Sequence, residues 1–120
     1  MTAEEGMQMV DGPQLHRQGM PKTLEQIVEN GGEGQLYLTF DIDCVDPTFA
    51  PGTGTPEVGG FSSAQCQELL QGLTPLAHQF VAYDMVEVMP AYHPAKTTSL
   101  LAANLVYGMM FLIAWSKKNW

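Results

Sequence analysis

The sequence predicts an α/β fold in which a parallel sheet is flanked by helices. Two segments, residues 35–42 and 79–88, are short, apolar and rich in the residue types of strands. Helical patterns precede, separate and follow them, and strands that are joined through helices pair in parallel. Two strands make a very small sheet, so we expect the 120 residues to form part of a domain.

Each predicted helix has its own signal. Residues 21–30 carry apolar side chains at helical spacing and are followed by two glycines. Ser62 and Gln65 have the spacing of a capping box, which predicts a helix over residues 63–73. The last helix is expected over residues 97–115, in a strongly apolar part of the chain.

The two ends of the chain bear on its location. Residues 1–20 are polar with no clear period, and the first six are too acidic for a signal or transit peptide, so we expect a cytoplasmic protein. Residues 99–115 carry no charge over 17 positions. That is at the short end of the roughly 17–25 residues that span a bilayer. Polar residues interrupt this stretch, and we expect a buried helix of a larger domain and no membrane contact.

Charge and cysteine content exclude several classes. Five Lys and Arg against thirteen Asp and Glu give a net charge of −8, which argues against nucleic acid and favours cationic ligands such as metal ions, amines and guanidinium groups. Cys44 and Cys66 are the two cysteines, so neither a disulfide framework nor a thiolate zinc site is expected. Cys44 has no obvious base beside it and is interpreted as a small packed side chain.

The segment F-D-I-D-C-V-D-P, residues 40–47, is the most informative. Side chains alternate along a strand, so Asp41 and Asp43 are expected on one face at its carboxyl end, where α/β proteins bind ligands. Neighbouring carboxylates repel unless a cation compensates, and their oxygens suit Mg²⁺, Mn²⁺ or Ca²⁺. The pair therefore predicts a metal site, while Asp46 fits either a supporting role or a simple turn before Pro47.

Two other metal-dependent sites begin with a similar motif. An EF-hand loop that starts at Asp41 needs a glutamate at its twelfth position, where this chain has Gly52, so that interpretation fails. In a phosphatase of the haloacid dehalogenase type, Asp41 would attack phosphorus and Asp43 would act as an acid. The Val-Asp-Pro that follows is not the turn expected there, and this interpretation is kept as a distant alternative.

Glu87 is the second candidate for chemistry. It closes the second predicted strand, so its carboxylate is expected to face the same crevice as the aspartate pair and suits a guanidinium group. Asp84 lies three residues earlier and is expected on the opposite side, in a supporting or structural role. The histidines, His16, His78 and His93, show no metal-ligand spacing and are interpreted as ordinary surface or core residues.

Two blocks of the chain resemble the ureohydrolase superfamily of arginases, agmatinases and related guanidino-compound hydrolases. They are FDIDCVDPTFAPGTGTPEVGG, residues 40–60, and residues 81–110. The resemblance implies a three-layer α/β/α, arginase-like fold, with residues 1–120 as the carboxyl-terminal part of one ureohydrolase domain. It also implies hydrolysis of a linear guanidino compound, agmatine first, to urea and an amine. The family uses a hydroxide between two metal ions, usually Mn²⁺, with Ni²⁺ as the other candidate.

The resemblance also implies roles for particular residues. Asp41 would bridge both metals and Asp43 would complete the coordination of the second. Glu87 would lie at the guanidinium end of the substrate pocket, and Thr55 would lie along its wall. No catalytic residue is assigned, because the family's catalytic-site histidine is absent from this chain.

The chain departs from the family pattern in ways that bear on its activity. The motif H-D-A-H-x-D and an earlier metal-binding histidine are absent, and the usual acidic residue near His93 is missing. Asp46 and Asp84 match acidic positions that would support the metal ligands from behind. We therefore expect an incomplete ureohydrolase that is inactive alone, or else a non-catalytic pseudoenzyme or partner subunit. The apolar residues 100–113 predict a homo-oligomer or pairing with a complementary chain.

Overall fold

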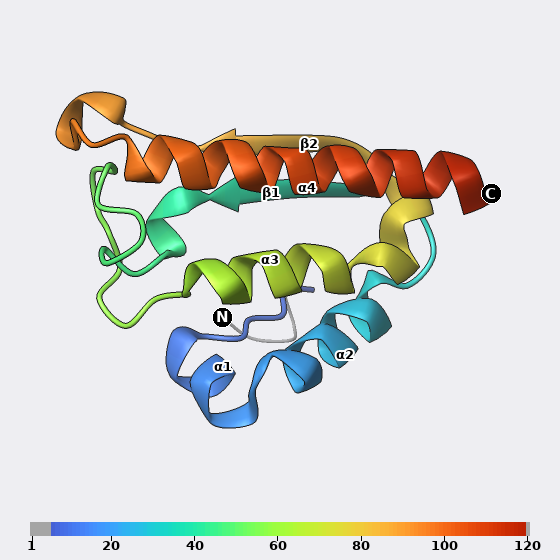
Figure 1. The fold of residues 1–120 in the computed structure, drawn as a ribbon. Helices are drawn as coiled ribbons and strands as arrows, with labels where there is room; N and C mark the ends of the chain where they lie inside the picture. Colours follow the sequence, from blue (N-terminus) through green and yellow to red (C-terminus); the bar gives the residue numbers. More distant parts are fainter. Residues whose placement is uncertain (1–5, 120) are drawn as a thin grey trace.

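The two predicted strands pair in parallel, and both end at the same edge of the sheet. β1 (Leu36–Asp41) and β2 (Phe80–Val86) lie side by side in the computed structural model, which describes residues 6–119 (Figure 1). Asp41 is opposite Val86 in the register. The prediction that no leader peptide is present rests mainly on residues 1–5, which lie outside the described residues, as does Trp120.

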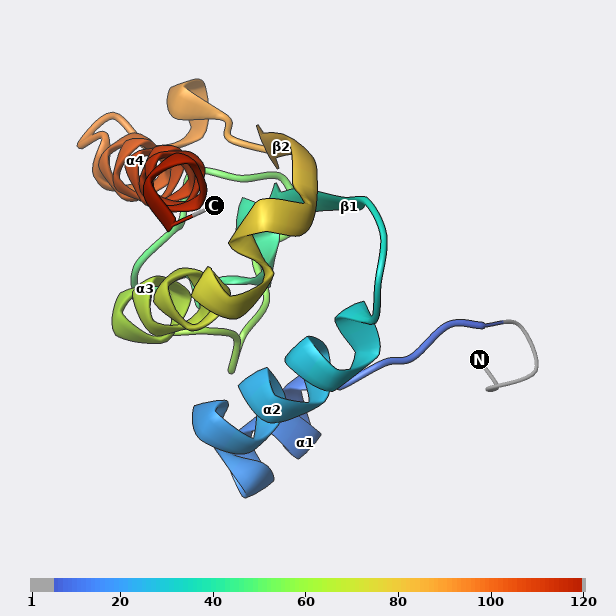
Figure 2. The same cartoon turned by 90° about the vertical axis from the view of Figure 1, so that its right-hand side faces the viewer.

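Helices cover one face of this sheet. They are α1 (Gly12–Gln18), α2 (Met20–Gly31), α3 (Ser63–Gly72) and α4 (Thr97–Asn119). Figure 2 shows α3 and α4 on one side of the strand pair, and Tyr37 and Ala82 are exposed on the other side. The predicted parallel sheet with flanking helices is confirmed, with the helices of this chain on a single face.

The hydrophobic core lies between the covered face of the sheet and the helices α3 and α4. Phe40 of β1 packs there with Leu70 of α3, and Ile42, Leu105 and Leu112 are completely buried. Burial of each such side chain stabilises the fold by roughly 1.5–3 kcal/mol. The core therefore fixes the position of the strand ends, at which the candidate carboxylates lie.

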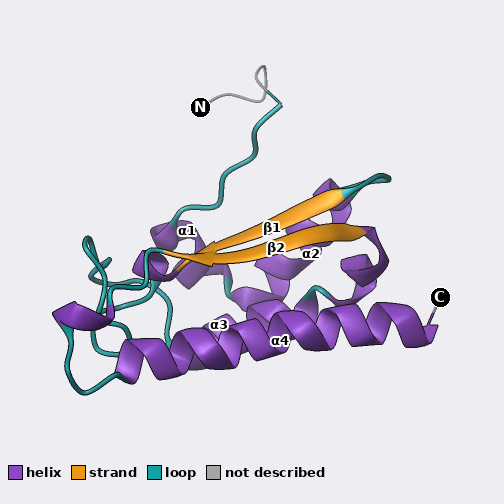
Figure 3. Ribbon diagram, turned by 90° about the horizontal axis from the view of Figure 1, so that it is seen from above, coloured by secondary structure: helices purple, strands orange, loops and turns teal. Residues whose placement is uncertain are grey.

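α4 meets the core along one stripe only. The helix continues to Asn119, past the predicted end at Trp115, and runs the length of the strand pair (Figure 3). Its outer face exposes large apolar side chains: Leu100, Val106, Tyr107, Met110, Phe111, Ile113 and Trp115. By length and composition it could cross a membrane, and 28% of its most apolar stretch is buried. Core helices of soluble proteins share this composition, so these properties are weak support for a membrane span.

Two elements differ from the sequence-based prediction. α1 was not expected, because its seven residues are too short to show a period; its signal is Asp11, whose Oδ1 accepts a hydrogen bond of 2.7 Å from the Gln14 N–H. β1 ends at Asp41 because the chain turns into a 3₁₀ helix at Ile42–Cys44. The capping box of Ser62, by contrast, is confirmed in both of its hydrogen bonds.

Candidate metal and substrate site

Asp41 and Asp43 lie together at the carboxyl end of β1, although strand alternation is the wrong reason for it. Asp41 is the last residue of the strand, whereas Asp43 belongs to the 3₁₀ turn that follows. The Asp43 N–H donates a hydrogen bond of 3.0 Å to Asp41 Oδ1. This turn folds Asp43 back onto Asp41 and so keeps the two acidic residues at the sheet edge.

Thr55 contacts this pair directly. Its Oγ1 donates to Asp43 Oδ2 at 2.8 Å, and the Glu57 N–H donates to the Asp43 carbonyl oxygen at 3.0 Å. Asp43 also lines a cavity of about 400 Å³ that is bordered by Cys44 and Glu57. The loop of residues 44–61, which includes Thr55 and Glu57, therefore orients one carboxylate oxygen of Asp43 and leaves the other available to a ligand.

Asp46 holds the loop in place. Its Oδ1 accepts from the Thr48 N–H at 2.8 Å, and its Oδ2 accepts from the Gly59 N–H at 2.9 Å. The Asp46 N–H donates to the Phe61 carbonyl oxygen at 2.9 Å. Asp46 thus joins the beginning of the loop to its end, and its contacts are with the loop rather than with Asp41 or Asp43.

Glu87 follows β2 in a strained backbone conformation. Its φ of 67° lies in the left-handed region, which costs a residue with a side chain roughly 1–2 kcal/mol. Its side chain is exposed and forms no ion pair with the described residues. Because Asp41 is paired with Val86, Glu87 begins at the same sheet edge as the aspartates and carries a free carboxylate there.

Asp84 lies on the sheet face that the helices leave open. Tyr37 donates a hydrogen bond from its hydroxyl to Asp84 Oδ2. The hydroxyl of Thr39, and after it that of Tyr37, lowers the pKa of Asp84 from its ordinary value. The described partners of Asp84 thus belong to β1, which places it as a structural group of the sheet.

The two thiols are packed groups rather than nucleophiles. Burial raises the pKa of Cys44 to about 12, with smaller contributions from Cys66 and from the negative charges of Asp41 and Asp43. Burial also raises the pKa of Cys66 to about 11. Because the thiolate is the reactive form, both residues stay protonated and unreactive at neutral pH.

Acid should weaken the fold through Asp46 and Asp84. Hydrogen bonds from Thr48 first and then from Gly59 lower the pKa of Asp46, and Asp84 is lowered by Thr39 and Tyr37. A lowered folded-state pKa contributes stability above the unfolded value of 3.8, and that stability is lost as pH falls through the folded-state pKa. We expect the urea concentration at the midpoint of unfolding to decrease when the pH is lowered below about 4. Asp46→Asn should show a shallower fall, and parallel curves for the parent and this variant would contradict the assignment.

The chemistry of the aspartate pair suits a metal ion, but the described residues do not complete a metal site. Its carboxylate oxygens suit a hard divalent cation, and the bond from Thr55 holds Asp43 as a ligand would need to be held. Such a cation takes about six ligands. Within residues 6–119, however, no group of three or more His, Cys, Asp or Glu side chains is arranged to hold a metal. The two carboxylates fit a metal centre only if other ligands come from elsewhere.

Two further contacts were not predicted from the sequence. Thr98, at the start of α4, is 1% exposed and accepts a hydrogen bond of 2.7 Å from the Gly52 N–H. Met89, after β2, donates its N–H to the Gly52 carbonyl oxygen at 2.8 Å. Gly52 thereby ties the loop to two distant segments. No local pattern could have revealed these pairs, because the partners are far apart in the sequence.

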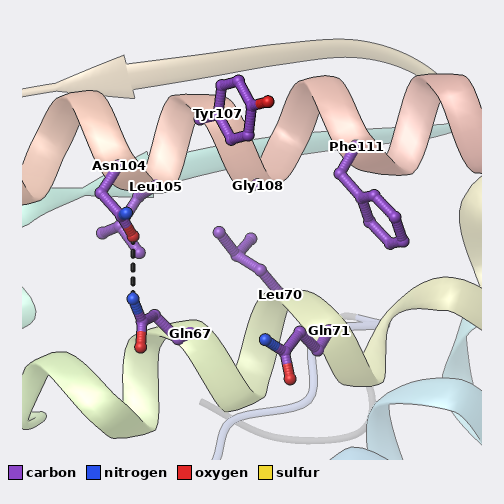
Figure 4. A pocket seen from close by; sticks show the side chains of 8 residues that line it. All are labelled: Gln67, Leu70, Gln71, Asn104, Leu105, Tyr107, Gly108 and Phe111. Carbon is purple, nitrogen blue, oxygen red and sulfur yellow. Dashed lines mark hydrogen bonds between the residues drawn. The ribbon is translucent and has the colours of Figure 1, made fainter.

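A second cavity lies away from the carboxylates, between α3 and α4 (Figure 4). It has a volume of about 370 Å³ and is bordered by Leu70, Tyr107 and Phe111. Gln67 Nε2 donates to Asn104 Oδ1 at 2.9 Å across its rim. With no carboxylate, histidine or cysteine in its lining, this cavity continues the apolar surface of α4 and is no candidate for the chemistry.

Comparison with curated proteins and solved structures agrees with this fold. The chain is 44% identical to the agmatinase of Photorhabdus laumondii over 116 residues, 97% of this chain and 37% of the relative. It superposes on a hypothetical agmatinase from Burkholderia thailandensis with a TM-score of 0.82 at 41% identity, covering 94% of this chain and 35% of that one. For the proclavaminate amidino hydrolase of Streptomyces clavuligerus the TM-score is 0.85 at 33% identity, with coverage of 94% and 37%.

The chain therefore spans little more than a third of the relatives that it matches. The model of the arginase family matches residues 1–112, which is nearly the whole chain. This match gives no support to the phosphatase alternative. On these grounds the chain belongs to the arginase family.

Proposed function

We propose that this chain is the carboxyl-terminal part of an agmatinase-like ureohydrolase, which hydrolyses a linear guanidino compound to urea and an amine. One observation carries the proposal: Asp41 and Asp43 lie at the sheet edge from which Glu87 also begins, and Thr55 orients Asp43 there. Agmatine is the first candidate substrate because relatives at 41–44% identity are agmatinases. Guanidinobutyrate and guanidine come next.

Each group has a defined task in this proposal. Asp41 and Asp43 would bind Mn²⁺, or Ni²⁺, together with ligands from the remainder of the domain. A bound divalent metal lowers the pKa of water and so supplies a nucleophile near neutral pH. Thr55 keeps Asp43 in its ligating orientation. Glu87 holds the guanidinium by a charge-assisted hydrogen bond, for which its unpaired carboxylate is suited.

Urea release tests this activity. The complete enzyme can come from a full-length gene, or from fusion of this chain to the preceding part of the Photorhabdus laumondii agmatinase. We expect urea from agmatine when Mn²⁺ is saturating, and a second product with a free amine. No urea from any of the three guanidino compounds, with either Mn²⁺ or Ni²⁺, would overturn the proposal.

The 120-residue chain alone should bind metal weakly and release no urea. Two carboxylates provide too few of the roughly six ligands that a hard cation takes. Calorimetric titration with Mn²⁺ should show weak heats that disappear in Asp43→Asn. A tight site with two metal ions per chain would contradict this expectation.

Glu87→Gln should lower kcat/KM of the complete enzyme about tenfold to a hundredfold. The substitution removes one negative charge but preserves size, and hydrogen bonds to charged groups contribute roughly 1.5–3 kcal/mol, about 1.4 kcal/mol being tenfold. Manganese content should stay unchanged, because the role of Glu87 is towards the substrate. Unchanged kinetics with intact metal content would remove Glu87 from the site.

A second candidate function is a non-catalytic partner subunit of a ureohydrolase. It is favoured by the lack of a third metal ligand within residues 6–119. The genomic sequence upstream of Met1 distinguishes the two candidates: an in-frame H-D-A-H-x-D motif supports the enzyme, and its absence supports the subunit. Under both candidates we propose a cytoplasmic protein that forms a homo-oligomer or pairs with a complementary chain.

A further inference from the structure

We propose that His16 is a positioning residue, which clamps the turn of residues 57–61 and through it holds Asp43 in place. His16 lies on α1, outside the blocks that carry the family resemblance. Its Nε2 is 2.7 Å from the Gly59 carbonyl oxygen. Because a carbonyl oxygen only accepts, Nε2 carries the proton and donates it. The contact joins residues that are 43 positions apart in the chain.

The helix that carries His16 is itself anchored at both ends. Leu15 is buried, and Asp11 caps the first turn. At the other end, Gln18 Nε2 donates to Thr23 Oγ1 and to Gln26 Oε1, both at 2.8 Å, which links α1 to α2. The imidazole therefore projects from a fixed support, as a positioning group requires.

The peptide groups around Gly59 are held on two sides. Its N–H donates to Asp46 Oδ2 at 2.9 Å, while its carbonyl oxygen accepts from His16. Gly59 has a φ of 79°, a conformation that glycine adopts freely, so hydrogen bonds rather than side-chain sterics must restrain it. His16 therefore completes the restraint that Asp46 begins.

This turn leads directly to Asp43. The Gly60 N–H donates to the Glu57 carbonyl oxygen, and the Glu57 N–H donates to the Asp43 carbonyl oxygen, each at 3.0 Å. Residues of α1, His16 included, also border the cavity that Asp43 lines. The path from His16 to Asp43 thus consists of hydrogen bonds joined by backbone of the turn, and it ends at the Asp43 carbonyl oxygen. This inference rests on the proposed function in one respect: the proposed function is the reason why the position of Asp43 matters.

Amide hydrogen exchange in the 120-residue chain tests the clamp without metal or substrate. In His16→Ala, the Glu57 and Gly59 amides should exchange about tenfold faster, which corresponds to about 1.4 kcal/mol. In His16→Gln they should remain within about twofold of the parent, because the glutamine amide donates from a similar position. Arg17→Ala, an exposed change at the next position of α1, is the matched control and should have no effect.

Amides of β1 should be unchanged in all three variants, which separates a local clamp from general destabilisation. Unchanged exchange at Glu57 and Gly59 in His16→Ala would overturn the inference. So would equal acceleration throughout β1, or a His16→Gln variant that behaves like His16→Ala. None of these outcomes depends on urea release, so the clamp can fail while the proposed activity stands, and the reverse.

Discussion

Gly60→Ala should disrupt the candidate site and lower the free energy of unfolding by about 3 kcal/mol or more. A Cβ at this position would lie 2.3 Å from the Cys44 carbonyl oxygen and 2.9 Å from both the Asp46 nitrogen and the Glu57 carbonyl oxygen. These are backbone atoms, which cannot move aside as the end of a flexible side chain can. Val45 and Phe61, which are the chain neighbours of these crowded residues, form an isolated parallel β-bridge.

Neighbouring glycines provide matched controls for this prediction. Gly59 has open space where a Cβ would lie but a φ of 79°, so Gly59→Ala should cost about 1 kcal/mol. Gly54 has Met89 Sδ at 3.9 Å as its nearest neighbour and no positive φ, so Gly54→Ala should be close to neutral. In urea unfolding, the loss of stability should increase from Gly54→Ala through Gly59→Ala to Gly60→Ala. A small loss of stability in Gly60→Ala would contradict the close packing.

The backbone groups that crowd Gly60 also form the hydrogen bonds that hold the candidate site. The Glu57 peptide donates to Asp43, and the Asp46 peptide donates to Phe61, so a displaced turn at Gly60 shifts the residues that hold Asp43. In a complete enzyme, Gly60→Ala should therefore lower Mn²⁺ content as well as stability. Glu87→Gln, by comparison, should leave the metal content intact.

The candidate site could be found from the sequence because much of its chemistry is contiguous. Asp41, Asp43 and Thr55 lie within one stretch of fifteen residues, and strand order alone brings Glu87 to the same edge. What could not be predicted depends on contacts between distant segments. The contact of His16 with Gly59 and that of Thr98 with Gly52 leave no periodic signal, since each joins elements more than forty residues apart.

Local geometry also departed from simple rules at the site itself. The alternation rule would keep Asp43 on the strand, but the Asp43 N–H bonds to Asp41 Oδ1 and the chain turns into a 3₁₀ helix. Hydrogen bonding by an aspartate side chain to nearby backbone competes with the ladder of a sheet. The left-handed conformation of Glu87 was equally unexpected, since glycine is the usual residue for it. Both departures occur at the carboxyl ends of β1 and β2, where Asp41, Asp43 and Glu87 lie.

The outer face of α4 should make the chain associate in plain buffer. Its large apolar side chains include Leu100 at 73% exposure, Tyr107 at 72% and Met110 at 57%. A contiguous apolar surface of this kind is usually an interface. Burial of a single Leu or Phe side chain contributes roughly 1.5–3 kcal/mol, so covering several of them outweighs the repulsion expected from a net charge of −8.

Sedimentation at tens of micromolar should therefore show dimers or larger species of the parent chain, and the double variant Met110→Lys with Phe111→Lys should be monomeric. A lysine ammonium that is buried without a partner costs far more than the contact returns, so association should weaken at least tenfold, or about 1.4 kcal/mol. Asn30→Lys with Gln35→Lys makes the same charge change at exposed positions away from α4 and should still associate. A stable monomeric parent would contradict the argument, and a chain kept in solution only by detergent would instead favour a membrane-spanning α4.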